Sequence, residues 1–284
     1  MKKHISTCIW LDNSASEAAS FYAQVLHNVQ ILSESPFLTG IDIDGTRVTL
    51  MNGGPSYRPS PAVSFYYLIE EEKDFNQVYT ALMQEGKVYL PLDQYPWAEK
   101  YAWVEDKFGV SWQLALGEIS LVNQRVSPFL TFTGANFGRG EEALSLYAEL
   151  FSDYQSGGVL KYPEAMGADY SGKIQHTQFS INGTVLMLSE NPQQHTWQFT
   201  EGNSFMLLCD SQEEIDSFWS KLSEGGEEGR CGWLKDKFGI SWQIIPSVLG
   251  SLMQDQSRIE AVSKAFMAMK KIDIETLTLA GVEV

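Results

Sequence analysis

Cysteine is scarce in this 284-residue chain, which contains only Cys8, Cys209 and Cys231. The three lie far apart and none belongs to a C-x-x-C pair, so the sequence indicates neither a disulfide framework nor a cysteine zinc site. Basic residues are also few: 20 Lys and Arg against 36 Asp and Glu give a formal net charge of −16. Because nucleic acids and anionic membranes are bound by clustered basic side chains, we expect neither as a partner.

Long apolar runs are missing as well. No stretch approaches the roughly 20 apolar residues that cross a bilayer, and the opening residues 1–4 lead into no signal-peptide core, so the sequence predicts a cytoplasmic protein. No G-x-G-x-x-G follows a strand-like stretch, although a methyltransferase that uses S-adenosylmethionine would usually show a Gly-rich turn of this kind. With 44% hydrophobic residues, the chain is long enough for about two globular domains.

An internal repeat is the strongest positive feature. Residues 106–114, DKFGVSWQL, recur at 236–244 as DKFGISWQI, with identical residues except for two aliphatic exchanges. Further matches precede this motif in the same order, among them Trp103 with Trp233 and Ser64 with Ser204. A repeat of this length must be recognised before the fold is assigned. We therefore predict two diverged copies of one strand-rich βαβββ-type module, over residues 1–119 and 127–246, and a C-terminal helical tail over residues 247–284.

Each copy shows the same series of expected elements. Opening strands (about 5–11 and 128–133) precede helices (14–26 and 140–151) whose apolar residues recur at helical spacing. The dipeptides Asp44-Gly45 and Asn182-Gly183 predict type I′ hairpin turns. Further strands (62–69 and 203–209) precede helices (74–84 and 213–223), and a last hairpin closes each copy. In the tail, the apolar residues Ile259, Val262, Phe266 and Met269 predict a helix face that packs on the body or on a partner chain.

Several segments are similar to one known family. They are CIWLD at 8–12, MNGGP at 51–55, the closing DKFG-x-SWQ motif, GGEEGRCGWL at 225–234 and MKKID at 269–273. Together they resemble the PhnB-like branch of the vicinal oxygen chelate superfamily, which includes glyoxalase I, bleomycin and fosfomycin resistance proteins and extradiol dioxygenases. Members of this branch are often labelled 3-demethylubiquinone-9 3-methyltransferase. The resemblance covers nearly the whole chain and implies an α+β fold in which paired modules form an open eight-stranded cup with a pocket inside.

The resemblance also implies where a metal would bind. In metal-dependent relatives, inward-facing strand positions supply His, Gln and Glu ligands to a divalent ion. The equivalent positions of the first copy are Thr7, Ser64 and Gln113. Those of the second copy are Leu130 or Thr131, then Ser204 and Gln243. Glutamine in place of glutamate removes the negative charge that a dication needs, so the usual metal site is expected to be degenerate.

His176 and Glu190 are the remaining candidates for metal ligands. His176 lies in the strand before the Asn182-Gly183 turn, and Glu190 lies at the far end of the partner strand. Together they could bind a metal or act as acid and base at neutral pH. The other histidines, His4, His27 and His195, are interpreted as structural.

A different role is expected for the glutamines of the repeated motif. If Trp112 packs on the helices, strand alternation turns Gln113 toward the cup, where its amide can orient a polar ligand. Aromatic residues, including Tyr66, Tyr101, Trp103 and Trp233, could form apolar walls. The expected ligand-binding set is therefore Thr7, Ser64, Tyr66, Gln113, Ser204, Gln243 and Trp233.

The leading functional hypothesis is a cytoplasmic protein that binds a small organic molecule and has lost the usual metal site, with the ligand unidentified. One alternative is a metal-dependent lyase, isomerase or dioxygenase that uses His176 and Glu190 of the second copy. Another is a non-catalytic interaction protein whose C-terminal helices dock a partner. A divalent metal as cofactor and a homodimer as assembly both stay open at this stage.

Overall fold

The structure is a computed structural model that describes residues 5–193 and 195–282, and these residues form two compact units. One unit spans residues 6–203, and the other contains residue 5 and residues 204–282. The division falls inside the second sequence repeat, because strands of the two repeats pair within the longer unit. None of the described helices is long and apolar enough to cross a membrane.

The described residues form four βαβββ modules, two in each sequence repeat. Module 1 comprises β1 (Ser6–Leu11), α1 (Ala15–Val25), β2 (Val29–Glu34), β3 (Leu38–Ile43) and β4 (Thr46–Asn52). Module 2 comprises β5 (Val63–Ile69), α2 (Glu72–Leu82), β6 (Lys87–Tyr95), β7 (Ala98–Glu105) and β8 (Ser111–Leu116). Each repeat therefore contains two βαβββ modules in succession, where the sequence indicated one longer unit.

The second repeat has the same order of elements. Module 3 comprises β9 (Val126–Phe132), α3 (Gly140–Leu150), β10 (Gln155–Lys161), β11 (Ile174–Ile181) and β12 (Thr184–Glu190). Module 4 comprises β13 (Asn203–Cys209), α4 (Gln212–Ser223), β14 (Glu227–Glu228), β15 (Trp233–Lys235) and β16 (Ser241–Pro246). Short 3-10 turns occupy Ile119–Leu121, Gly134–Asn136 and Glu164–Met166. The tail contains α5 (Leu249–Leu252), α6 (Ile259–Ala268) and α7 (Ile274–Leu279).

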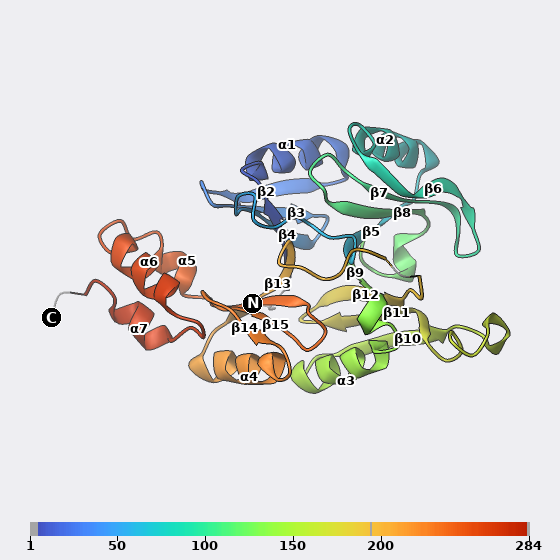
Figure 1. The fold of residues 1–284 in the computed structure, drawn as a ribbon. Coiled ribbons are helices and arrows are strands. Elements are labelled where there is room, and N and C mark those ends of the chain that lie inside the picture. The colour runs from blue at the N-terminus through green and yellow to red at the C-terminus, as the bar shows by residue number, and fades with distance from the viewer. Residues whose placement is uncertain (1–4, 194, 283–284) are drawn as a thin grey trace. The chain divides into compact units, whose positions relative to one another are not determined.

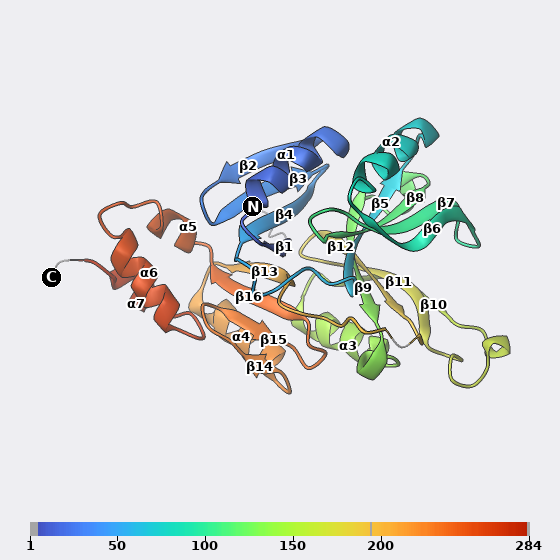
Figure 2. The same cartoon turned by 45° about the horizontal axis from the view of Figure 1, so that its top comes forward.

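Modules 2 and 3 join into one open eight-stranded sheet with the order β10-β11-β12-β9-β5-β8-β7-β6. The joint is the antiparallel pair β5 and β9, in which Ser64 lies opposite Phe129 and Tyr66 lies opposite Ser127. Figure 2 shows these strands running continuously from β6 to β10. The predicted α+β class, the eight-stranded open sheet and the C-terminal helices are thus confirmed.

The hairpin turns follow directly from their dipeptides. Asp44 and Gly45 have φ values of 49° and 92°, and Asn182 and Gly183 have 48° and 70°. Positive φ at both central residues defines the type I′ turn, whose twist matches that of the flanking strands. The Asp42 carboxylate also accepts a hydrogen bond from the Gly45 N–H. These turns set the register of β3 with β4 and of β11 with β12.

Helices cover one face of the eight-stranded sheet. Within the longer unit, α2 packs on β5, β7 and β8, and α3 packs on β11 and β12 (Figure 1). The core beneath the helices includes Phe65, Tyr67, Phe75, Trp112 and Leu114. Because side chains alternate along a strand, the neighbours of these residues point to the opposite face. We call that opposite face of the eight-stranded sheet the inner face.

Candidate functional site

The repeated DKFG-x-SWQ motif shapes the strand that carries Gln113. The Asp106 carboxylate accepts hydrogen bonds from the backbone N–H groups of Phe108 and Val110. Its second oxygen accepts from the Trp112 indole at 2.9 Å and from the Tyr22 hydroxyl at 2.8 Å. The second repeat forms the corresponding bonds from Asp236 to Phe238, Ile240 and Trp242. The most similar part of the two repeats therefore has a structural role, which is to fix the turn and the tryptophan before the glutamine.

Gln113 lies on the inner face and joins two other side chains. Trp112 is fully buried on the helix side, so Gln113 points the other way. Its Oε1 accepts a hydrogen bond from the Tyr101 hydroxyl at 2.7 Å, and its Nε2 donates to the Ser64 Oγ at 2.8 Å. We call Tyr101, Gln113 and Ser64 the Gln113 network. In this arrangement the Ser64 proton and the second N–H of Gln113 are left to donate to a ligand.

Aromatic rings surround the Gln113 network. Tyr66 follows Ser64 on the inner face of β5, and its ring lies 6.2 Å from that of Phe129. Burial raises the pKa of Tyr66 to about 12, so its hydroxyl stays protonated and can donate. Burial likewise raises the pKa of Tyr101. These rings offer an apolar surface with hydroxyl groups at its edge.

The link between β12 and β13, described at residues 191–193 and 195–202, adds rings at one side of the inner face. Its Trp197 lies 5.9 Å from Trp103 of β7 and is stacked on His195 at 4.2 Å. The Trp103 indole donates to the Ser111 Oγ at 2.7 Å, which places Trp103 on the inner face. The segment is anchored by a 2.6 Å hydrogen bond from the Ser60 hydroxyl to the Gln198 carbonyl. The sequence offered no sign of this contact, because it joins residues nearly a hundred positions apart.

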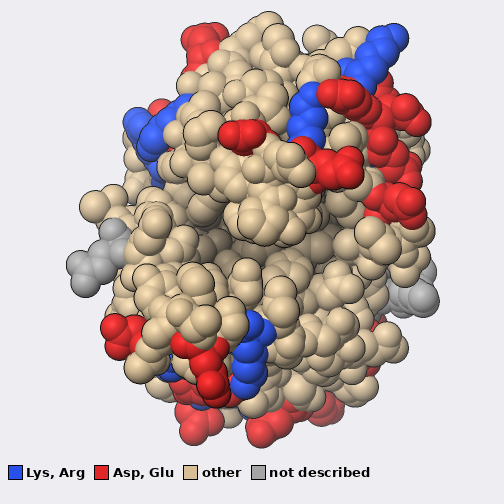
Figure 3. Space-filling model, turned by 90° about the vertical axis from the view of Figure 1, so that its right-hand side faces the viewer, with Lys and Arg blue, Asp and Glu red and all other residues tan. Residues whose placement is uncertain are grey.

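The inner face carries little charge. Across β8, β5, β9, β12 and β11, no position on the same face as Gln113 is Lys, Arg, Asp or Glu. At its β7 side, Glu105 is hydrogen-bonded by the Tyr89 hydroxyl. Figure 3 looks onto the side of the molecule where β6 and β10 lie and shows a hollow whose interior has no coloured charged residues. Such a surface suits an uncharged molecule better than an ion.

The predicted position of Thr7 is corrected by the structure. Side chains alternate along β1, so Thr7 lies on the same face as Ile9 and Leu11, which pack in the core with α1. Cys8 lies on the opposite face. Thr7 is 1% exposed. The assumed register was one residue off at this strand, and such a slip turns a side chain to the opposite face. Thr7 therefore lies among the helix-covered residues.

The candidates of the fourth module lie in the shorter unit. Gln243 donates from Nε2 to the Ser204 Oγ at 2.9 Å, as Gln113 does to Ser64. Trp233 lies opposite Gln243 in the pairing of β15 and β16. The position that matches Tyr101 is Cys231, so the three-membered network exists only in module 2 among the described residues.

His176 and Glu190 are not brought together by the fold. Thr177 pairs with Leu188, which lies in the same strand and on the same face as Glu190, whereas His176 points to the other face. The Glu190 carboxylate accepts hydrogen bonds from the backbone N–H groups of Gly140, at 2.8 Å, and Ile174, at 2.5 Å. It thereby caps the first turn of α3. The predicted pair is thus separated by the sheet itself.

His176 does lie on the inner face. Its ring centroid is 5.8 Å from that of Phe129. Burial lowers the pKa of His176, so the imidazole is neutral at pH 7. The pairing of β12 with β9 sets Ser189 opposite Thr131. Thr177 pairs with Leu188, and continuing that register by one residue puts Ser189 beside His176. These three polar residues form a row on neighbouring strands.

The inner face does not fit a divalent metal. Its donors around Gln113 are a neutral amide and hydroxyls that already bind each other, and His176 has no carboxylate on its own face of β9, β11 or β12. Within residues 5–193 and 195–282, no group of three or more His, Cys, Asp or Glu side chains could hold an ion. His4, which the sequence analysis interpreted as structural, lies outside the described residues.

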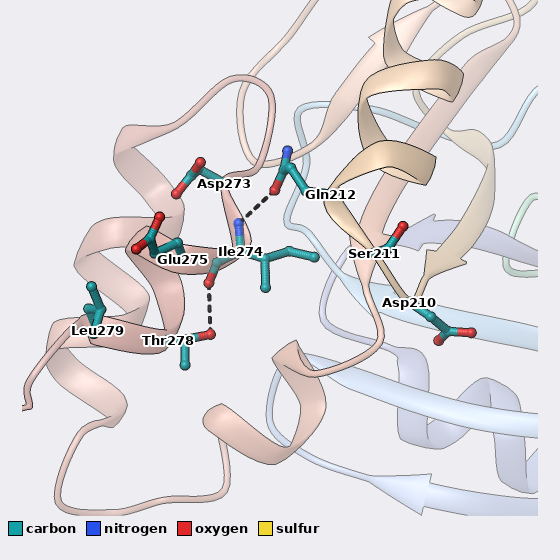
Figure 4. A pocket seen from close by; sticks show the side chains of 8 residues that line it. All are labelled: Asp210, Ser211, Gln212, Asp273, Ile274, Glu275, Thr278 and Leu279. Atoms are coloured by element: carbon teal, nitrogen blue, oxygen red, sulfur yellow. Dashed lines mark hydrogen bonds between the residues drawn. The ribbon is translucent and has the colours of Figure 1, made fainter.

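A separate groove of about 450 Å³ lies in the shorter unit, between the start of α4 and α7 (Figure 4). Two of its three acidic residues are used by the protein: Asp273 accepts from the Thr276 N–H, and Asp210 accepts from the Ser247 hydroxyl. Gln212 further ties the two helices together by accepting from the Ile274 N–H at 2.9 Å. The groove thus follows from the packing of the tail and offers few free polar groups.

The fold defines a class of protein. Glyoxalase I from Zea mays matches with a TM-score of 0.57 and 11% identity, over 89% of this chain and 97% of the maize chain, a likeness that shows the fold alone. A PhnB protein from Bacillus cereus is 28% identical over 39% of this chain and 98% of its own, with a TM-score of 0.37. The maize match shows that the chain has a fold like that of glyoxalase I.

The family follows from the sequence of both repeats. A family model described as 3-demethylubiquinone-9 3-methyltransferase matches residues 3–115 and again residues 124–245. The chain belongs to this family and contains two tandem copies of its domain, as the sequence resemblance predicted. A search of curated proteins found no match.

Proposed function

We propose that this protein binds a small, neutral, partly apolar organic molecule on the inner face of the eight-stranded sheet. The observation that carries the proposal is the Gln113 network, a buried chain of hydrogen bonds that ends at Ser64 among aromatic rings. Ligand sites in proteins are mostly apolar, with a few placed polar groups that orient the ligand. Tyr66, Ser64 and Gln113 supply that combination.

The charge of the face selects the ligand class. An ionised ligand would lose its water without gaining an opposite charge on the five central strands, which costs several kcal/mol in a poorly solvated site. A neutral ring compound loses little and stacks on Tyr66 and Phe129. A hydroxyl or carbonyl group on that ring can bind the free donors of Ser64 and Gln113.

Methyl transfer is not part of the proposal, since the chain shows no Gly-rich turn of the kind that binds S-adenosylmethionine. Nor does the proposal include metal-dependent chemistry, because the donors on the inner face do not suit a dication. The cytoplasmic location and the homodimer suggested by the sequence stay predictions.

Titration of the full chain with 2,6-dihydroxynaphthalene tests the proposal, because this compound is neutral and aromatic, and its two hydroxyls can bind the Gln113 network and a second polar group of the inner face at the same time. Calorimetry should show saturable binding that weakens about tenfold in Gln113→Leu, as expected for the loss of one hydrogen bond. Gln24→Leu, on the exposed side of α1, is the matched control and should leave the affinity unchanged. Equal affinity in wild type and Gln113→Leu would contradict a site at the Gln113 network.

A further inference from the structure

We propose that His176 is a proton acceptor for the bound molecule, and that Thr131 and Ser189 hold the oxygen from which the proton leaves. The proposal rests on the proposed function, since it assigns chemistry to the same inner face. It concerns the side of the face that module 3 contributes, whereas the Gln113 network belongs to module 2. The class of ligand is thereby narrowed to neutral ring compounds that carry an acidic hydroxyl.

The first support is the placement of the three side chains in one row. Thr131 of β9 lies opposite Ser189 of β12. Ser189 and His176 each adjoin the last pair of β11 with β12, Thr177 with Leu188, so the continued register puts them side by side. Neighbouring strands lie about 4.8 Å apart, and side chains directly opposite have Cβ atoms about 5 Å apart. One ligand oxygen above Ser189 can therefore reach the hydroxyls of Ser189 and Thr131 and the imidazole of His176.

The second support is an unsatisfied hydroxyl. Thr131 is 3% exposed, and its Oγ1 has no hydrogen-bond partner among the described residues. A buried hydroxyl without a partner costs about 1–3 kcal/mol, so such groups usually mark a place where a ligand or a water binds. Thr131 shares its strand and its face with Phe129, whose ring lies beside both His176 and Tyr66. A ring seated on Phe129 would bring its substituent to this hydroxyl.

The third support is the state of the imidazole. Burial lowers the pKa of His176, which leaves a nitrogen lone pair free at neutral pH. On β10 it pairs with Leu160, and on β12 the continued register puts Ser189 beside it; neither residue carries a charge. The phenol of Tyr66, beyond Phe129, stays protonated because burial raises its pKa to about 12. No nearby charge on these described strands therefore competes for the proton.

The chemical step is balanced without any co-reactant. The O–H bond of the ligand breaks, a new N–H bond forms on the imidazole, and the electron pair stays on the ligand oxygen. The hydroxyl protons of Thr131 and Ser189 then point at that oxygen and stabilise its negative charge, as donors aimed at a developing oxyanion do in other sites. Return of the proton to a different atom of the ring would complete a tautomerisation.

2-Naphthol reports this step directly, because its hydroxyl becomes strongly acidic on excitation and the anion emits at a longer wavelength than the neutral molecule. With the full chain in excess, the bound probe should show anion emission. The ratio of anion to neutral emission should fall roughly tenfold or more in His176→Gln and in His176→Phe, which both remove the base. His176→Phe keeps a ring against Phe129 and serves as the second variant if His176→Gln disturbs packing.

The Thr131→Val variant separates binding of the ligand hydroxyl from proton transfer to His176. It has a similar shape but no hydroxyl, so it should weaken 2-naphthol binding about tenfold, the worth of one hydrogen bond, while anion emission from the bound probe persists. Bound probe whose emission ratio is the same in wild type and in both His176 variants would overturn the proton-acceptor role and leave the binding proposal intact. Failure of 2-naphthol to bind would overturn the proton-acceptor role, and failure of 2,6-dihydroxynaphthalene to bind would overturn both proposals.

Discussion

Replacing Gln113 by leucine should destabilise the protein more than replacing Gln243 by leucine. Both glutamines are 5% exposed and both donate to a buried serine. Gln113 also accepts from the Tyr101 hydroxyl, whereas the second repeat has Cys231 at that position. Leucine at 113 thus leaves two buried hydroxyls without a partner, and leucine at 243 leaves one. Each orphaned hydroxyl costs about 1–3 kcal/mol, so the two variants should differ by about that amount.

Urea unfolding of the full chain measures this difference, provided the slopes of the transitions agree. Hydrogen exchange of the backbone amides in β8 and β16 then assigns each loss to its own module, since the chain need not unfold in one step. Adding Tyr101→Phe to Gln113→Leu removes one orphaned hydroxyl and should restore about 1 kcal/mol or more. Equal losses in the two single variants, or no recovery in the double variant, would show that the orphaned hydroxyls do not set the difference.

Three further predictions concern other parts of the molecule. Burial raises the pKa of Asp106 to about 6, so the folded state holds this proton more tightly than the unfolded state. The stability of the wild type relative to Asp106→Asn should therefore be highest below pH 4 and about 3 kcal/mol lower above pH 6. Urea unfolding of both proteins at a series of pH values measures this difference. Gly202→Ala would set a Cβ 1.7 Å from the Arg58 carbonyl oxygen, so the backbone at residue 202 must shift. The free energy of unfolding should then fall by about 1–3 kcal/mol. Its control is Gly250→Ala, where the new Cβ has open space and should stabilise α5 by about 0.5–1 kcal/mol. Metal analysis after dialysis against Mn²⁺, Ni²⁺ or Zn²⁺ should show no stoichiometric retention, because the inner face offers no carboxylate beside His176 among the described residues; one tightly held ion per chain would contradict this.

Local sequence signals predicted most of the elements that have a buried face. The four module helices begin and end within two residues of their predicted bounds, because their apolar residues follow a helical period. Asp-Gly and Asn-Gly set the two hairpin turns. The sequence does not predict the edge strands β2 and β10, because all or nearly all of their residues are exposed and show no alternation of apolar and polar residues. Their pairing depends on neighbouring strands and not on their own pattern.

The candidate site was predictable where strand alternation alone decides orientation. Gln113 faces inward because Trp112 is buried under the helices, as the sequence indicated. Glu190 could not be placed in this way, because its partners are backbone groups near the start of α3 and of β11. Trp197 reaches Trp103 through an irregular segment, and such tertiary contacts leave no periodic signal. The row of Thr131, Ser189 and His176 required the register of three strands at once.

A crystal structure of the full chain soaked with 2-naphthol would locate the binding site without relying on any variant. We predict the naphthol ring against Tyr66 and Phe129, with its hydroxyl within hydrogen-bond distance of inner-face side chains. Density for the compound only in the groove beside α7, or an inner face filled by the protein's own side chains, would contradict binding on the inner face.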